Sequence, residues 1–147
     1  MMEIIINAQK KRVQQSLHND AITKKKTQEE DQVKLAAIAI SLNIRLRSAD
    51  MPFSLQERAI CYTRSLLSST ATNRPSPTIL AGAIKKEFDL LYGPAWHCVV
   101  GKSFGSFVTH SPGGFVYYSV DSLCFLLFKT EVKLVTEPPA QLPLQRT

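Results

Sequence analysis

The stretch WHCVVGKSFGSFVTH, residues 96–110, and the stretch FVYYSVDSLCFLLF, residues 115–128, decide the fold of this chain. In both, aromatic and β-branched residues recur with a period of two, which is typical of β-strands. Glycines and short polar links interrupt the two stretches, as chain reversals require. We therefore predict an antiparallel meander with strands over residues 96–100, 104–109, 115–120 and 123–128.

Two helices are predicted upstream of the meander. Ser54 opens a capping-box pattern, which indicates a helix over about residues 55–69. Ser76 and Pro77 are a favoured N-cap and first helical residue, and the second helix that they start ends at Gly93. Apolar side chains form one stripe along each helix, namely Leu55, Ala59, Tyr62 and Leu66, and then Leu80, Ile84, Phe88 and Leu91.

An alternating segment precedes the first helix. Apolar residues fall on one face of it and polar residues on the other, which predicts a half-buried strand that begins at Ile40. The apolar set is Ile40, Leu42, Ile44 and Leu46. The order strand, helix, helix and meander predicts an α+β fold in which two helices pack on an antiparallel β-sheet. A domain of this size buries only about 60 to 65% of its unfolded surface, so association with another chain would stabilise it.

The two ends of the chain differ in composition from this domain. Residues 10–34 are rich in Gln, Lys, Glu and Asp and poor in aromatics, so they are expected to form a mobile arm. Proline recurs beyond Glu137, which predicts an extended tail. We expect a disordered basic and polar arm over residues 1–39, a folded domain over 40–131 and a proline-rich tail over 132–147.

Composition argues against several classes of protein. The formal net charge of +6 is spread along the chain, and the basic runs at residues 10–12 and 24–26 are short, so nucleic-acid binding is only an alternative interpretation. No apolar stretch has the length of a membrane span, and the first residues lack the charge order of a secretory signal. We expect a soluble, cytoplasmic protein with no membrane partner.

Catalytic, metal and cofactor sites are not expected. The cysteines Cys61, Cys98 and Cys124 lack the spacing of metal ligands or of a disulfide framework. His97 and Cys98 are neighbours on a predicted strand, so their side chains point to opposite faces. A pairing of His97 with Cys124 across strands stays open, which leaves a cysteine-dependent enzyme as an alternative. The sequence GKS at residues 101–103 lacks the first glycine of a phosphate-binding loop.

The segment from Phe104 to His110 is unusual for its glycine in the middle of a predicted strand. Alternation places Phe104, Ser106, Val108 and His110 on one side, and Gly105, Phe107 and Thr109 on the other. A mid-strand glycine often marks the close approach of another backbone. The segment is therefore either an ordinary central strand or an open edge that accepts a peptide or a partner subunit.

Several longer stretches of the sequence resemble those of a known protein family. AIKKEFD at residues 83–89, YGPAWHCVVGKSFGSFVTH at 92–110 and LLFK at 126–129 resemble the small cytoplasmic dynein light chains of the eight-kilodalton type. ADM at residues 49–51 fits as well, so the resemblance covers about residues 43–131. The arm and the tail lie outside it.

The resemblance implies a non-catalytic, cytoplasmic and cytoskeleton-associated adaptor that works as a homodimer. In that family the strand that matches residues 104–109 crosses to complete the sheet of the other subunit. Short disordered segments of partner proteins, often with a Thr-Gln pair, then add as a further strand beside the second helix. The dynein intermediate chain is one such partner. A general dimerisation hub unconnected to a motor is the alternative.

The resemblance also assigns residues. The peptide-binding groove that it implies comprises Phe104, Gly105, Ser106, Phe107, Val108, Thr109, His110, Phe115 and Tyr117. The dimer interface that it implies comprises His97, Phe104, Ser106, Val108 and Thr130. Protonation of His97 is expected to weaken the dimer, because an imidazole that becomes charged in an interface loses hydration. Thr130 stands where the family has a phosphorylatable serine, and a phosphate there would place negative charge near its two-fold mate.

Some residues depart from the family pattern. Pro77 and Thr78 stand where the family has an acidic residue and a lysine that contact the peptide, so side-chain selection of partners is expected to differ. Phe107 lacks the hydroxyl of the usual tyrosine, and Ser119 replaces an aromatic residue. The arm sequence KKTQ at residues 25–28 resembles the core of the peptides that the family binds. We hypothesise that the arm occupies a groove and competes with partners.

Overall fold

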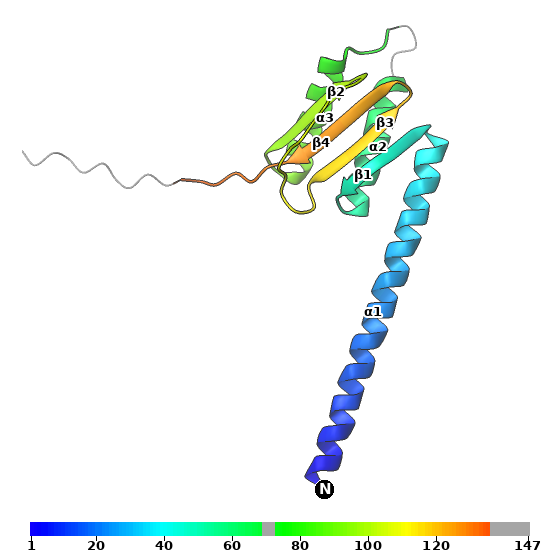
Figure 1. Cartoon of the computed structure of the whole chain (residues 1–147), viewed down its shortest axis with the longest axis vertical. Coiled ribbons are helices and arrows are strands. Elements are labelled where there is room, and N and C mark those ends of the chain that lie inside the picture. Colours follow the sequence, from blue (N-terminus) through cyan, green and yellow to red (C-terminus); the bar gives the residue numbers. More distant parts are fainter. Residues whose placement is uncertain (69–72, 136–147) are drawn as a thin grey trace, which may run out of the picture.

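The computed structural model describes residues 1–68 and 73–135. In chain order the elements are α1 (Met2–Ser41), β1 (Ile44–Asp50), α2 (Phe53–Ser68), α3 (Pro77–Tyr92), β2 (Trp96–Gly101), β3 (Phe115–Val120) and β4 (Leu123–Lys129). Helices α2 and α3 cover one face of a β-sheet, whereas α1 projects away from the domain (Figure 1). The α+β prediction is confirmed, with α1 as an additional helix.

The sheet has four antiparallel strands in the order β1-β3-β4-β2. Strands β2, β3 and β4 match three of the predicted strands to within a residue, but β2 pairs with β4, so the predicted meander order is wrong. The order leaves β1 and β2 at the two edges, where alternate backbone groups point away from the sheet.

The core lies between this sheet and helices α2 and α3. Its centre contains Ala59, Ile60, Leu80, Ile84, Phe88, Trp96, Val116, Tyr118, Phe125 and Leu127, all nearly inaccessible to solvent. The hydroxyls of Thr63 and Tyr118, both fully buried, are 2.6 Å apart and satisfy each other. Burial raises the pKa of Tyr118, which therefore stays protonated as the hydrogen bond requires.

The start of α3 follows the sequence prediction, whereas the start of α2 does not. The Ser76 hydroxyl accepts a hydrogen bond from the Ile79 amide at 3.3 Å, and Pro77 is the first helical residue. Helix α2 begins at Phe53, so Ser54 lies inside the first turn and the predicted capping box is wrong. The Pro52 carbonyl accepts the free amides of this turn instead. The predicted C-terminal residue of this helix, residue 69, lies outside the described residues.

The segment expected to be a mobile arm is the 40-residue helix α1. Its composition suggested disorder because residues 10–34 are polar, charged and poor in aromatics, yet Leu35 and Ala39 near its end are buried in the core. The KKTQ segment is helical too, and the Thr27 hydroxyl donates to the Thr23 carbonyl. Strand addition needs an extended backbone, so in this conformation the arm cannot pair in a groove. No helix of the described chain is long and apolar enough to cross a membrane.

The first strand starts later than predicted. Helix α1 continues to Ser41, and Ile40 is a helical residue that is 79% exposed. Asn43 reverses the chain with a φ of 57°, and its side-chain amide donates to Asp121 at 2.9 Å. Ile44 and Leu46 do face the core side as expected, because the period of two applies only beyond this reversal.

Candidate functional site

A groove of about 550 Å³ lies between α3 and the edge strand β2. Its walls are Thr78, Ala81, Gly82 and Lys85 from α3, and Trp96, His97, Cys98 and Val99 from β2, with Phe128 beside them. The helical spacing of 78, 81, 82 and 85 places these residues on one face of α3. Sequence reasoning singled out Thr78 but not Ala81, Gly82 or Lys85, although their spacing was available as a signal. Backbone groups of an edge strand beside a helical wall can receive an added strand.

The side chain of Asp89 links α3 to the beginning of β2 by a hydrogen bond. Its carboxylate accepts a hydrogen bond from the Trp96 amide at 2.8 Å and forms an ion pair with Lys85. Desolvation opposes ionisation, but the hydrogen bonds from Lys85 and Trp96 outweigh it and hold the pKa of Asp89 below its usual value. The carboxylate therefore holds α3, which forms one wall of the groove, next to the edge strand β2. This residue was not identified from the sequence.

Replacing Asp89 should make the domain less stable at neutral pH but not in acid. Because the pKa is lowered in the folded state, the carboxylate stabilises the fold above about pH 4, and this contribution is lost as the pH falls through the folded pKa. We expect Asp89→Asn to lower the free energy of unfolding by about 1 kcal/mol near pH 7. Urea titrations followed by circular dichroism at neutral and acidic pH, at one protein concentration, measure this difference. Asp20→Asn on the exposed part of α1 is the control, and an Asp89→Asn deficit that persists in acid contradicts the assignment.

Residues 104–110, here called the open segment, connect β2 to β3 without strand pairing. Within the described chain no strand pairs with them, so the predicted strand over 104–109 is wrong for a single subunit. Phe107 is fully exposed, and a Cβ added at Gly105 would meet no atom within 4 Å. The segment has the composition of a strand but lacks a neighbouring strand in its own chain.

Both ends of the open segment are held by contacts. Phe104 packs edge-on against Tyr117, with ring centroids 6.2 Å apart. His110 stacks on Phe115 at 4.8 Å, and its Nδ1 lies 2.9 Å from the Ser111 carbonyl oxygen. The Ser111 amide then donates to the Lys129 carbonyl at 2.7 Å. These contacts pack the two ends of the open segment, Phe104 and His110, against Tyr117 and Phe115 of β3. All four residues belong to the predicted groove.

Two residues of the predicted interface, His97 and Thr130, lie together at the β2 edge. The His97 Nε2 is 2.9 Å from the Thr130 hydroxyl, and the imidazole stacks on Phe128 with centroids 5.1 Å apart. His97 is exposed in the single subunit. The other predicted interface residues, Phe104, Ser106 and Val108, belong to the open segment.

The cysteine side chains do not form a nucleophilic site with His97. Cys98 points to the core side of β2, and burial raises its pKa to about 12, so the thiol stays protonated at neutral pH. Cys124 pairs in register with Gly101, whereas His97 pairs with Phe128, four residues further along β4. Across the part of the chain that the structure describes, no cluster of His, Cys, Asp and Glu could hold a metal ion.

Comparison with known proteins agrees with this architecture. The sequence profile of the family "Dynein light chain type 1" matches residues 43–130. A "Dynein light chain 1, cytoplasmic" from Debaryomyces hansenii is 41% identical over 85 residues, which cover 58% of this chain and 89% of that relative. The protein of the same name from Saccharomyces cerevisiae is 39% identical over 85 residues, which cover 58% of this chain and 88% of the relative.

A solved structure shows the same fold. The dynein light chain-like domain of a calcium-binding protein from Fasciola hepatica superposes with a TM-score of 0.55 at 20% identity, over 61% of this chain and 94% of that chain. The profile match spans the sheet, helices α2 and α3, the groove and the open segment. This chain is therefore a member of the dynein light chain type 1 family.

Proposed function

We propose that this protein is a non-catalytic, dimeric adaptor that binds linear motifs by β-strand addition. In this proposal the open segment of one subunit pairs with the β2 edge of a second copy, and a partner peptide pairs with the far edge of that segment. The observation that carries the proposal is an unpaired edge strand beside a groove, together with an extended segment that lacks a strand partner in its own chain. The edge strand β2 has no neighbouring strand on one side, and the open segment has no strand partner among the described residues, so each can pair with the other in a second copy.

Local geometry supports the exchange of strands between subunits. The exposed Phe107 and the free space around Gly105 leave room for a second backbone to approach the open segment. A short strand needs neighbouring strands to be stable, and the described residues of one subunit provide none for the open segment. Pairing between two copies would complete the sheet on both sides of a two-fold axis.

The proposed roles follow the residues predicted from sequence. Gly105 to His110 supply the backbone that pairs with the peptide, while Phe104, Phe115 and Tyr117 form the apolar floor and wall. Thr78 replaces a charged side chain on the groove wall, so partner selection is expected to rely on backbone pairing and on the small residues Ala81 and Gly82. The absence of an ionised nucleophile at Cys98 favours an adaptor over a cysteine-dependent enzyme.

The relatives suggest the cellular setting. Two of them carry the name "Dynein light chain 1, cytoplasmic", so we propose that this chain also acts in the cytoplasm as a dynein light chain associated with the cytoskeleton. Its proposed partners are dynein intermediate chain-like and other disordered proteins with Thr-Gln motifs. A bivalent partner would bind both grooves of one dimer, so weak binding at each site suffices through effective concentration.

Peptide titration together with sedimentation tests this function. Trp96 is the single tryptophan of the chain and lines the groove, so its fluorescence reports on groove occupancy. We expect a dimer that binds one Thr-Gln peptide per subunit, with affinity weakened about tenfold when the glutamine of the peptide is replaced by proline. A monomer at micromolar concentration that binds no such peptide contradicts the proposal.

Negative charge at Thr130 should weaken the dimer. The Thr130 hydroxyl lies beside His97 at the proposed subunit interface, where a phosphate would face its two-fold mate. We expect Thr130→Glu to raise the dimer dissociation constant about tenfold or more, as measured by sedimentation velocity over a dilution series. Thr130→Val removes the hydroxyl without adding charge and is the matched control. Equal dimerisation of the two variants shows that charge at this position is unimportant.

A further inference from the structure

The sheet has a second open edge, and this edge also lies beside a helix. A groove of about 460 Å³ separates the last turns of α1 from the beginning of β1. It is lined by Ala36, Ala39 and Ile40 of α1, by Asn43 at the reversal, and by Ile44, Arg45 and Leu46 of β1. Helix α1 and strand β1 diverge from their junction (Figure 1).

This groove depends on α1, which is outside the part shared with the family. The family profile begins at residue 43, and the aligned 85 residues already make up 89% and 88% of the two relatives from yeasts. The remainder of each relative is too short for a helix of 40 residues. The helical wall beside β1 is therefore a feature of this chain rather than of the shared domain.

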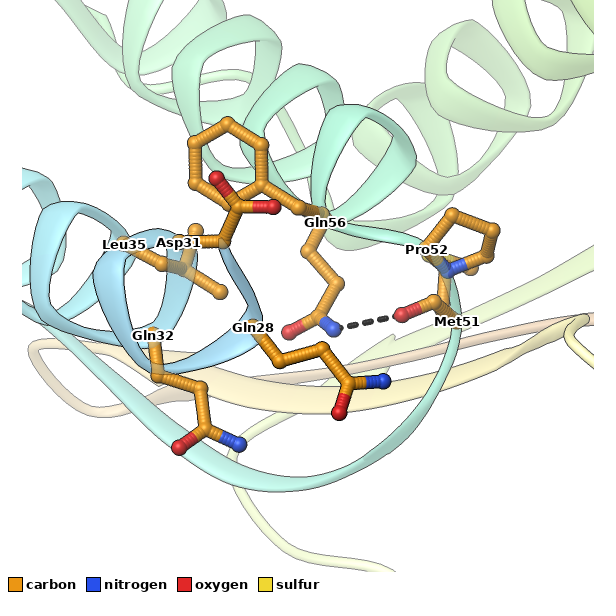
Figure 2. A pocket seen from close by; sticks show the side chains of 8 residues that line it. Gln28, Asp31, Gln32, Leu35, Met51, Pro52 and Gln56 are labelled. Atoms are coloured by element: carbon orange, nitrogen blue, oxygen red, sulfur yellow. Dashed lines mark hydrogen bonds between the residues drawn. The ribbon is translucent and has the colours of Figure 1, made fainter. Parts of the chain in front are cut away.

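The last turns of α1 pack against the core of the domain and form one wall of this groove. Leu35 and Ala39 are buried in the core cluster, and Ile38 and Leu42 pack against it. On the domain side, α1 and the start of α2 also enclose a small hollow in which Gln56 donates to the Met51 carbonyl at 2.6 Å (Figure 2). The opposite side of α1 leaves Ile40 79% exposed at the mouth of the groove.

The two faces of β1 next to the groove differ in chemistry. Ile44 and Leu46 point to the core side, where Ala36 and Ile40 of α1 continue the apolar surface. Arg45 and Arg47 point to the other face and are exposed. Arg45 is the only charged residue that lines the groove among those described, and the nearby Asp121 is already paired with Arg74 at 2.8 Å.

We propose that this edge is a second strand-addition site, which binds an extended peptide of a partner protein in which apolar and acidic residues alternate. Side chains of an added strand point alternately to the two faces, so apolar residues meet Ala36 and Ile40 while acidic residues meet Arg45. The register shift between Leu46 and Ser48 bends β1, so pairing is confined to its first residues. The site is separate from the β2 edge, because the sheet order places β1 and β2 at opposite edges.

Fluorescence anisotropy with a labelled octapeptide of alternating valine and glutamate tests this site on the full chain. We expect it to bind more tightly, by at least about tenfold, than a peptide of the same composition with the valines and glutamates in two blocks. Hydrogen exchange at residues 44–47 should slow when the alternating peptide is bound. Equal affinity for the two peptides, or no binding of either, overturns the proposal.

Matched variants locate the site. Ile40→Lys and Arg45→Glu change exposed side chains and should each weaken the alternating peptide about tenfold, whereas Ile22→Lys on the distal part of α1 and Lys86→Glu on α3 should leave it unchanged. Circular dichroism confirms that each variant is folded. Loss of binding in Phe107→Pro instead assigns the peptide to the β2 groove and overturns the proposal. Binding seen only after residues 132–147 are removed shows that the tail of this chain is the occupant, which also overturns it.

Discussion

Phe107→Pro and Val108→Pro should have opposite phenotypes, one losing the dimer and the other losing peptide binding. Successive backbone amides of a strand point to opposite edges, and proline removes one amide. If the open segment lies between the β2 edge of a second copy and a bound peptide, each proline removes a hydrogen bond on one side only. We expect the affected equilibrium to weaken about 30- to 100-fold and the other to change far less.

Sedimentation equilibrium measures the dimer in this experiment, and Trp96 fluorescence measures the peptide. Phe107→Ala is the matched control, because it removes a fully exposed side chain and keeps the backbone amide. Phe107 makes no side-chain contact that supports the subunit, so its phenotype should not arise from unfolding, and circular dichroism checks the fold of the variant at the half-buried Val108. Two prolines that leave both equilibria unchanged would show that the open segment is an ordinary loop.

Phe88→Ala should cost a large share of the stability of the domain. Phe88 is fully buried on α3, and its ring lies 4.9 Å from that of Trp96 and 5.1 Å from that of Tyr92. Removing a buried aromatic ring loses its transfer free energy and leaves a cavity, which together amount to about 3 to 5 kcal/mol. A small domain is stable by about 5 to 15 kcal/mol, so much of the folded population at elevated temperature would be lost.

Leu90→Ala is the control for this prediction because Leu90 lies on the same helix and is 81% exposed. We expect it to change the free energy of unfolding by less than about 0.5 kcal/mol. Urea unfolding followed by circular dichroism measures both variants, at one protein concentration because the proposed dimer would contribute to stability. Equal stability of the two variants would contradict the assignment of Phe88 to the core.

The groove could be predicted only in part. Period-two patterning predicted β2, β3 and β4, and the N-cap at Ser76 predicted the start of α3, because both signals depend on neighbouring residues. The contacts of Asp89 with Trp96 and Lys85 were not predicted, because nothing in the local pattern shows which carboxylate of a helix meets the first amide of a strand. The open segment was predicted as a strand because its composition suits one, although none of the described strands of its own subunit pairs with it.

The sequence alone determined strands β2, β3 and β4, the start of helix α3 and the resemblance to dynein light chains, since periodicity, capping and motif spacing are local properties. The tertiary structure, and not the sequence, showed that residues 2–41 form a helix, because the docking of Leu35 and Ala39 on the core is a contact between distant parts of the chain. It also decided which strands are edges, since strand order depends on pairing between distant residues. Both proposed binding sites lie at edges of the sheet beside helices, so their positions follow from the strand order.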